Sequence, residues 1–142
     1  MAKRSIVALL GEDSEDYLAC VIVDTDKGAL LMPDVVVAEV VGWQAKTGQC
    51  VWRERHLPVL DVSGGQDRVC LLVCHGGQQN DHDFWAISVA SLPRMMRIRG
   101  EDIHHADAQL VYSWQRGWVS IDGKHFVLPD FEALEEAVIK GE

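Results

Sequence analysis

The dipeptide Asp122-Gly123 stands between two short strand-like runs, 118–121 and 124–128. A two-residue β-hairpin loop of type I′ requires positive φ at both loop positions, and Asp-Gly is one of the pairs that tolerate this conformation. The sequence therefore predicts two antiparallel strands joined by a tight turn. Runs of similar length recur along most of the chain, separated by turn residues, and this pattern favours a mainly β fold.

The other strand-like runs are rich in Val, Ile and Leu. They cover residues 21–23, 29–32, 35–41, 58–62, 69–75, 85–90 and 95–98. The run 69–75 is apolar throughout, which is typical of a strand buried on both faces. Cys70 and Cys74 lie in this run, about 13 Å apart if it is extended. That separation is too long for a disulfide, so we interpret both as core residues.

One segment, near the end of the chain, has helical periodicity. Its apolar residues recur at i, i+3, i+7 and i+8, and they are Phe131, Leu134, Val138 and Ile139. Asp130 is a suitable N-cap in front of them. The pattern predicts a helix over about residues 130–140. About eight to ten short strands followed by one helix suggest small barrels or a sandwich.

The charge balance limits the classes of partner. The chain has 142 residues, with 13 Lys and Arg against 22 Asp and Glu and a formal net charge of −9. An acidic excess argues against nucleic acid as the main partner and against adhesion to an anionic membrane surface. No apolar stretch approaches the ~20 residues of a membrane span. None of the four cysteines forms Cys-x-x-Cys, so we expect free thiols and a cytoplasmic protein.

The length suits one domain. Residues 11–16 are polar and mostly acidic. We therefore interpret residues 1–18 as a partly mobile lead-in and residues 19–142 as a single domain.

Histidines are the first residues to consider for catalysis or metal binding. Asp81-His82-Asp83 is typical of a solvated turn, and the neighbours His104 and His105 would point apart on any regular element. No zinc-binding His-Glu-x-x-His motif and no Gly-x-Ser-x-Gly motif occurs. The sequence therefore predicts neither an enzyme nor a cofactor. A small-ligand or metal-binding β-barrel that uses His82, His104, His105 and nearby acids is the alternative.

Several short motifs follow one another in a distinctive order. They are Val37-Ala38-Glu39-Val40, Gly48, Val51-Trp52-Arg53-Glu54, Pro58-Val59-Leu60-Asp61-Val62, the run 85–92 and Pro129-Asp130-Phe131-Glu132-Ala133-Leu134. From about residue 19 to residue 138 their order and spacing resemble the CheW-like domain, the adaptor fold of bacterial chemosensory arrays. Glu54 and Ala90 depart from the Gly and the Asp of that pattern, and the segment 42–47 is shorter. Trp52-Arg53 and Leu92-Pro93-Arg94 look closer to the divergent ChpC-type adaptors of chemosensory pilus systems.

The resemblance implies two small five-stranded SH3-like barrels that share a hydrophobic junction, with the C-terminal helix added. It also implies a non-enzymatic adaptor between the cytoplasmic tip of a chemoreceptor and the regulatory domain of a CheA-type histidine kinase. Carried over to this chain, the receptor groove of the family gives Val37, Glu39, Arg53, Leu92 and Met95 as partner-binding residues. Arginines gather at 53–55 and 94–99. We therefore expect a locally basic, apolar groove on an acidic body.

Overall fold

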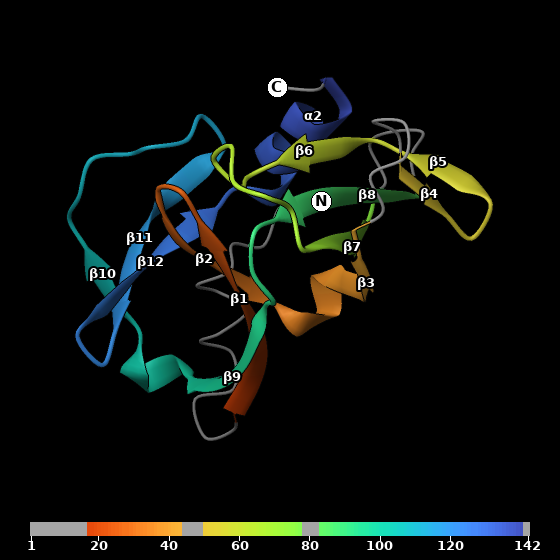
Figure 1. Cartoon of the computed structure of the whole chain (residues 1–142). Coiled ribbons are helices and arrows are strands. Elements are labelled where there is room, and N and C mark those ends of the chain that lie inside the picture. Colours follow the sequence, from red (N-terminus) through yellow and green to blue (C-terminus); the bar gives the residue numbers. More distant parts are fainter. Residues whose placement is uncertain (1–16, 44–49, 78–82, 141–142) are drawn as a thin grey trace.

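The computed structural model describes residues 17–43, 50–77 and 83–140 (Figure 1). Within them, twelve strands, two short 3-10 turns and one α-helix form the fold. The strands are β1 (Tyr17–Thr25), β2 (Gly28–Pro33), β3 (Val37–Gly42), β4 (Cys50–Trp52), β5 (Arg55–Leu57), β6 (Val59–Asp61), β7 (Cys70–His75), β8 (Phe84–Val89), β9 (Arg94–Arg99), β10 (His104–Ala106), β11 (Gln115–Ile121) and β12 (Lys124–Pro129). The turns are η1 (Asp34–Val36) and η2 (Gly100–Asp102), and the helix is α2 (Phe131–Lys140).

These strands form two main sheets and a separate hairpin. The six-stranded sheet has the order β10-β11-β12-β2-β1-β9, the four-stranded sheet has the order β3-β7-β8-β6, and β4 pairs only with β5. Two pairs, β12 with β2 and β6 with β8, are parallel, and the other pairs are antiparallel. The mainly β fold with two β subdomains and a C-terminal helix is confirmed.

The strands divide as six, four and a two-stranded hairpin, where the resemblance implied five and five. The division follows from the path of the chain. The first two strands pair with strands from the C-terminal third, so the six-stranded sheet is built from both parts of the sequence. The four-stranded sheet comes from the middle of the chain.

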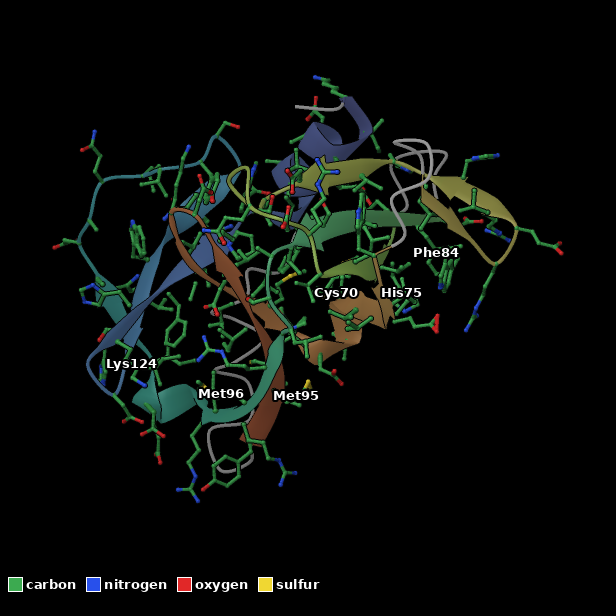
Figure 2. The ribbon with its side chains drawn as sticks, viewed as in Figure 1. Cys70, His75, Phe84, Met95, Met96 and Lys124 are labelled. Carbon is green, nitrogen blue, oxygen red and sulfur yellow. The ribbon has the colours of Figure 1, made fainter. Side chains whose placement is uncertain are left out.

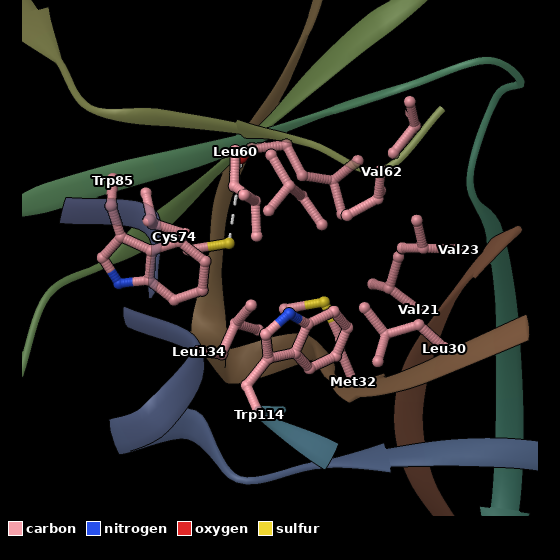
Figure 3. Packing of buried hydrophobic residues seen from close by; sticks show 14 of the residues in the cluster. Val21, Val23, Leu30, Met32, Leu60, Val62, Cys74, Trp85, Trp114 and Leu134 are labelled. Atoms are coloured by element: carbon pink, nitrogen blue, oxygen red, sulfur yellow. Dashed lines mark hydrogen bonds between the residues drawn. The ribbon is translucent and has the colours of Figure 1, made fainter. Parts of the chain in front are cut away.

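The core consists of three clusters, one inside each subdomain and one between them. The middle one, here called the junction cluster, includes Val21, Val23, Leu30, Met32, Leu60, Val62, Cys74, Trp85, Trp114 and Leu134 (Figure 3). Side chains alternate along β1: Val21 and Val23 face this cluster, whereas Cys20 and Ile22 face the interior of the six-stranded subdomain. The shared hydrophobic junction that the resemblance implied is therefore present.

Several local predictions agree closely with the structure. Asp122 and Gly123 have φ values of 52° and 76°, as a type I′ turn requires. The strand β7 is buried at every residue except its last, His75. The backbone N–H of Ala133 donates a 3.2 Å hydrogen bond to Oδ1 of Asp130, which caps the helix as expected.

Other boundaries differ from the sequence-based prediction. The apolar run 35–41 begins as the turn η1, and the strand starts only at Val37. The short strand β10 was missed because His104-His105-Ala106 has no apolar alternation. The first strand begins at Tyr17, inside the expected lead-in, and residues 1–16 lie outside the described part of the chain.

Candidate functional site

The five predicted partner-binding residues come from both subdomains. Val37 and Glu39 lie on β3, the edge strand of the four-stranded sheet, and Arg53 lies in the turn between β4 and β5. Leu92 follows β8, on the connection that crosses to the other subdomain, and Met95 lies on β9, the edge strand of the six-stranded sheet. The structure joins two of these residues directly and places the others beside the junction.

Glu39 and Arg53 meet through Trp52. A bulge in β3 between Val37 and Glu39 shifts the pairing, so that Glu39 lies opposite Val73 on the face toward the hairpin. The indole Nε1–H of Trp52 donates a 2.6 Å hydrogen bond to Oε2 of Glu39. The guanidinium of Arg53 lies 3.8 Å from the same oxygen and 4.5 Å from the centre of the Trp52 ring. A cation over an indole face is attracted to the ring electrons, so the Trp52 ring helps to hold the guanidinium of Arg53 in place.

The base of the hairpin is aromatic. The rings of Trp52 and Phe84 pack edge to face, with centroids 4.7 Å apart. Arg55 lies 5.6 Å from the centre of the Phe84 ring and forms a 3.0 Å ion pair with Asp83. We call Glu39, Trp52, Arg53, Arg55 and Phe84 the hairpin cluster. Because β4 and β5 pair only with each other, these side-chain contacts hold the hairpin in place.

The hairpin turn is strained. Arg53 and Glu54 have φ values of 48° and 65°, and Trp52 pairs with Arg55, so the loop has two residues. A residue with a Cβ in this left-handed region costs about 1 kcal/mol relative to its ordinary conformation. Glu54 therefore adopts the conformation that a glycine would adopt more easily. Backbone strain of this kind is common at functional sites, and Arg53 is one of the two strained residues of this turn.

Leu92 and Met95 expose 68% and 66% of their surface. Met95 pairs with Val21, which belongs to the junction cluster. Because paired residues point to the same face of a sheet, Met95 lies on the face of the six-stranded sheet that forms the junction. On the other side, Val40 of β3 pairs with Leu72, which belongs to the junction cluster, and Val40 is 43% exposed. Figure 2 shows Met95 on β9. We call Val40, Leu92 and Met95 the apolar edge.

Val37 pairs with Cys74 at the start of β3. It is half-buried and packs against the junction cluster. It therefore contributes to the wall of the junction rather than to the exposed surface. The structure thus brings Glu39 and Arg53 together in the hairpin cluster, and places Leu92 and Met95 on the apolar edge.

The arginines that form ion pairs near the predicted site lie in two groups, one on each subdomain. Arg94 pairs with Asp24 at 2.9 Å and Arg99 with Glu101 at 3.3 Å, both on the six-stranded subdomain. Arg53 and Arg55 pair with Glu39 and Asp83, which lie on the four-stranded subdomain beside the hairpin. The expectation of a locally basic groove stays a prediction: each group of arginines has nearby carboxylates that balance part of its charge.

The described residues hold no metal centre. Among residues 17–43, 50–77 and 83–140, no three His, Cys, Asp or Glu side chains are placed to hold an ion. His104 and His105 are exposed on β10. Two further positions from the sequence analysis, Gly48 and His82, lie outside the described residues.

The three cysteines with described side chains, Cys20, Cys70 and Cys74, are free and buried. Burial, with a smaller contribution from the charge of Asp34, raises the pKa of Cys20 to about 12. Burial also raises the pKa of Cys70 and Cys74. Thiols that stay protonated at neutral pH are poor nucleophiles and poor metal ligands, so these cysteines serve the core.

Sequence reasoning missed the contact that organises the site. Trp52 and Glu39 are thirteen residues apart and lie on different sheets, so no local pattern links them. Val40 was also missed, because its exposure follows from β3 being an edge strand. The sequence signal for Trp52 was its place beside Arg53 in the turn motif.

No family model matches the chain, and no curated protein matches it in sequence. A solved structure does match: the scaffolding protein TtCheW from Thermoanaerobacter tengcongensis, with a TM-score of 0.62 and 13% sequence identity. The match covers 80% of this chain and 84% of that chain. The chain therefore has a CheW-like fold. Within the described residues, no helix has the length and apolar character to cross a membrane.

Proposed function

Starting from a CheW-like fold, we propose that the protein is a non-enzymatic, cytoplasmic adaptor of a bacterial chemosensory system. It couples the cytoplasmic tip of a chemoreceptor to the regulatory domain of a CheA-type histidine kinase. The observation that carries the proposal is the fold shared with a scaffolding protein over 80% of the chain.

The receptor site of the proposal consists of Val37, Glu39, Arg53, Leu92 and Met95. A helical receptor tip can lay an apolar face against exposed apolar side chains, and Leu92 and Met95 supply these at the edge of the junction. Arg53 supplies a planar donor that can pair with a carboxylate or a carbonyl oxygen of the partner. Its ion pair with Glu39 is long, at 3.8 Å, so most of its donors are available.

We further propose that the adaptor is of the ChpC type and serves a chemosensory pilus system. One support is the pair Trp52-Arg53, in which the guanidinium lies over the indole ring. The other is the segment Leu92-Pro93-Arg94, on the connection between the two subdomains. In this chain the turn works without a glycine, because Glu54 takes the left-handed conformation.

Binding measurements with the cognate kinase regulatory domain and receptor-tip fragments test the proposal. The intact chain is expected to bind at least one of them. Arg53→Glu and Leu92→Asp are expected to weaken receptor binding by about tenfold or more, which is about 1.4 kcal/mol. Lys124→Glu, at the exposed first residue of β12, is the matched charge-reversal control and should bind as the intact chain does.

The outcomes separate two claims. Binding of the intact chain to neither partner would overturn the adaptor function. Full receptor binding by both Arg53→Glu and Leu92→Asp would overturn the site assignment and leave the adaptor function standing. Circular dichroism and unfolding curves of each variant show that the loss of binding does not come from loss of the fold.

A further inference from the structure

A recess with a volume of about 520 Å³ opens beside the strand β11, on the six-stranded subdomain. It forms because the chain leaves the sheet after β10 and runs alongside β11 before joining it. Its lining includes His105, Asp107, Leu110, Arg116, Trp118 and Leu128. In Figure 1 the strands β10 and β11 lie at the opposite end of the molecule from the hairpin of β4 and β5. The recess is therefore separate from the hairpin cluster.

The outer wall of the recess is tied to β11 at two points. The side chain of Gln115 is buried; its Oε1 accepts a 2.9 Å hydrogen bond from the backbone N–H of Val111, and its Nε2 donates a 3.0 Å hydrogen bond to the carbonyl of Gly117. The indole N–H of Trp118 donates a 3.0 Å hydrogen bond to the carbonyl of Gln109. These bonds span the segment that forms the wall, so the recess has a defined shape.

A bulge brings Arg116 into the lining. The pairing with β12 shifts between Gln115 and Gly117, so Arg116 has no partner residue on the neighbouring strand. A β-bulge of this kind turns a side chain away from its regular direction and is common beside binding sites. Among the described residues, no carboxylate forms an ion pair with Arg116. Its guanidinium is therefore available to an anion.

The chemistry of the lining is uneven. Trp118 and Leu110 supply apolar surface, whereas Leu128 is buried and adds little. Arg116 and His105 supply hydrogen-bond donors, and Asp107 supplies one negative charge. Sites for small molecules are concave and combine apolar surface with a few polar groups that fix the orientation of the ligand. This recess has both kinds of surface, and more of it is polar than apolar. A carboxylate can form a bidentate pair with a guanidinium. The flat apolar part of a ligand can pack on an indole ring. The carboxylate of Asp107 disfavours a second negative charge.

We infer that this recess binds a small monocarboxylate with a flat or branched apolar body, with its carboxylate on Arg116. The site is independent of the adaptor function proposed above. Its test is titration of the full ¹⁵N-labelled chain with phenylacetate, indole-3-acetate and 4-methylpentanoate, followed by two-dimensional NMR. Saturable shifts are expected in the amides of 105–110 and 116–118 and in the indole N–H of Trp118. The expected Kd is about 1 mM or tighter for at least one of the three acids.

The controls identify the role of charge. Phenylacetamide and indole-3-acetamide, which lack the negative charge, should bind about tenfold more weakly than their acids. Arg116→Gln should remove this preference, and Asp107→Asn should strengthen binding of the acids. Arg97→Gln, on the outer edge strand, is the matched control and should leave binding unchanged.

Three results would overturn the inference. They are the absence of saturable shifts for all three acids up to ~10 mM, equal affinities for acids and amides, and unchanged binding by Arg116→Gln. Because Arg116 is exposed and lies in a bulge, its substitution leaves the core intact. A native spectrum of the variant confirms this in the same experiment.

Discussion

The indole N–H of Trp52 donates a 2.6 Å hydrogen bond to Oε2 of Glu39, and this bond attaches the β4–β5 hairpin to the edge strand β3. The backbone of the hairpin forms no ladder with either main sheet. The position of Arg53 therefore depends on a side-chain contact. Glu39 is a positioning residue: it holds the tryptophan over which the arginine lies.

Removing the acceptor should loosen the hairpin. Glu39→Ala is expected to lower the free energy of unfolding by about 1–2 kcal/mol, because a mostly buried indole N–H loses a charged acceptor. Glu39→Gln keeps an acceptor oxygen and should lose less. Urea unfolding followed by tryptophan fluorescence measures both. Equal losses in the two variants would show that the hydrogen bond is not the cause.

Relieving the strain in the hairpin turn should stabilise the protein. Glu54→Gly is expected to raise the free energy of unfolding by about 1 kcal/mol, because glycine adopts positive φ without a Cβ penalty. Gly123→Ala is the reciprocal change in the other two-residue turn, where φ is 76° and nothing crowds the added methyl; it should destabilise by a similar amount. Thermal unfolding checks both, and a destabilised Glu54→Gly variant would contradict the argument.

Two adjacent glycines after β6 should respond differently to the same substitution. Gly64 and Gly65 have φ values of 68° and 86°, so alanine is strained at both. A methyl at Gly64 would also overlap Cβ of Asp26, whereas a methyl at Gly65 meets nothing within 4 Å. Gly64→Ala should therefore be the more destabilising variant, by at least about 1 kcal/mol. Equal unfolding curves for the two variants would show that the loop of Asp26 moves aside freely.

Asp61 should make the stability depend on pH. Burial acts to raise its pKa, but hydrogen bonds from Ser63 and Ser88 and the charge of Arg68 outweigh burial, and the pKa lies below its ordinary value. A lowered pKa in the folded state stabilises the fold above the unfolded value of about 4, and this contribution is lost as the pH falls through the folded value. The stability difference between the intact chain and Asp61→Asn should therefore be constant from pH 7 to 5 and shrink below pH ~4. A difference that stays unchanged down to pH ~2 would contradict this assignment.

Neighbouring methionines on β9 should separate binding from stability. Met95 is exposed, whereas Met96 packs against the cluster inside the six-stranded subdomain. Met95→Gln should leave the free energy of unfolding within about 0.5 kcal/mol and weaken receptor binding. Met96→Gln should lower stability and leave the binding of the folded fraction unchanged. The reverse pattern in unfolding curves and binding isotherms would remove Met95 from the site.

Parts of the fold follow from local sequence. The turn at Asp122-Gly123 depends on two adjacent residues that tolerate positive φ, and the helix after Asp130 depends on periodicity and a cap. The burial of β7 follows from an apolar run too short for a helix and too continuous for a surface strand. The positions of Arg53 and Leu92 in the candidate site came from the order of motifs, which reflects the resemblance rather than local physics.

By itself, then, the amino-acid sequence determined most of the strands, the tight turn, the C-terminal helix and the acidic balance, because each depends on neighbouring residues and on composition. The short strands β4, β5 and β10 were not predicted. Only the tertiary structure decided which strands and side chains lie next to one another. The parallel pairing of β2 with β12 joins segments almost a hundred residues apart, and the bulge in β3 turns Glu39 toward Trp52. Such contacts depend on which faces are buried together. A periodic pattern shows that one face of a strand is buried, but it does not show which other element covers that face.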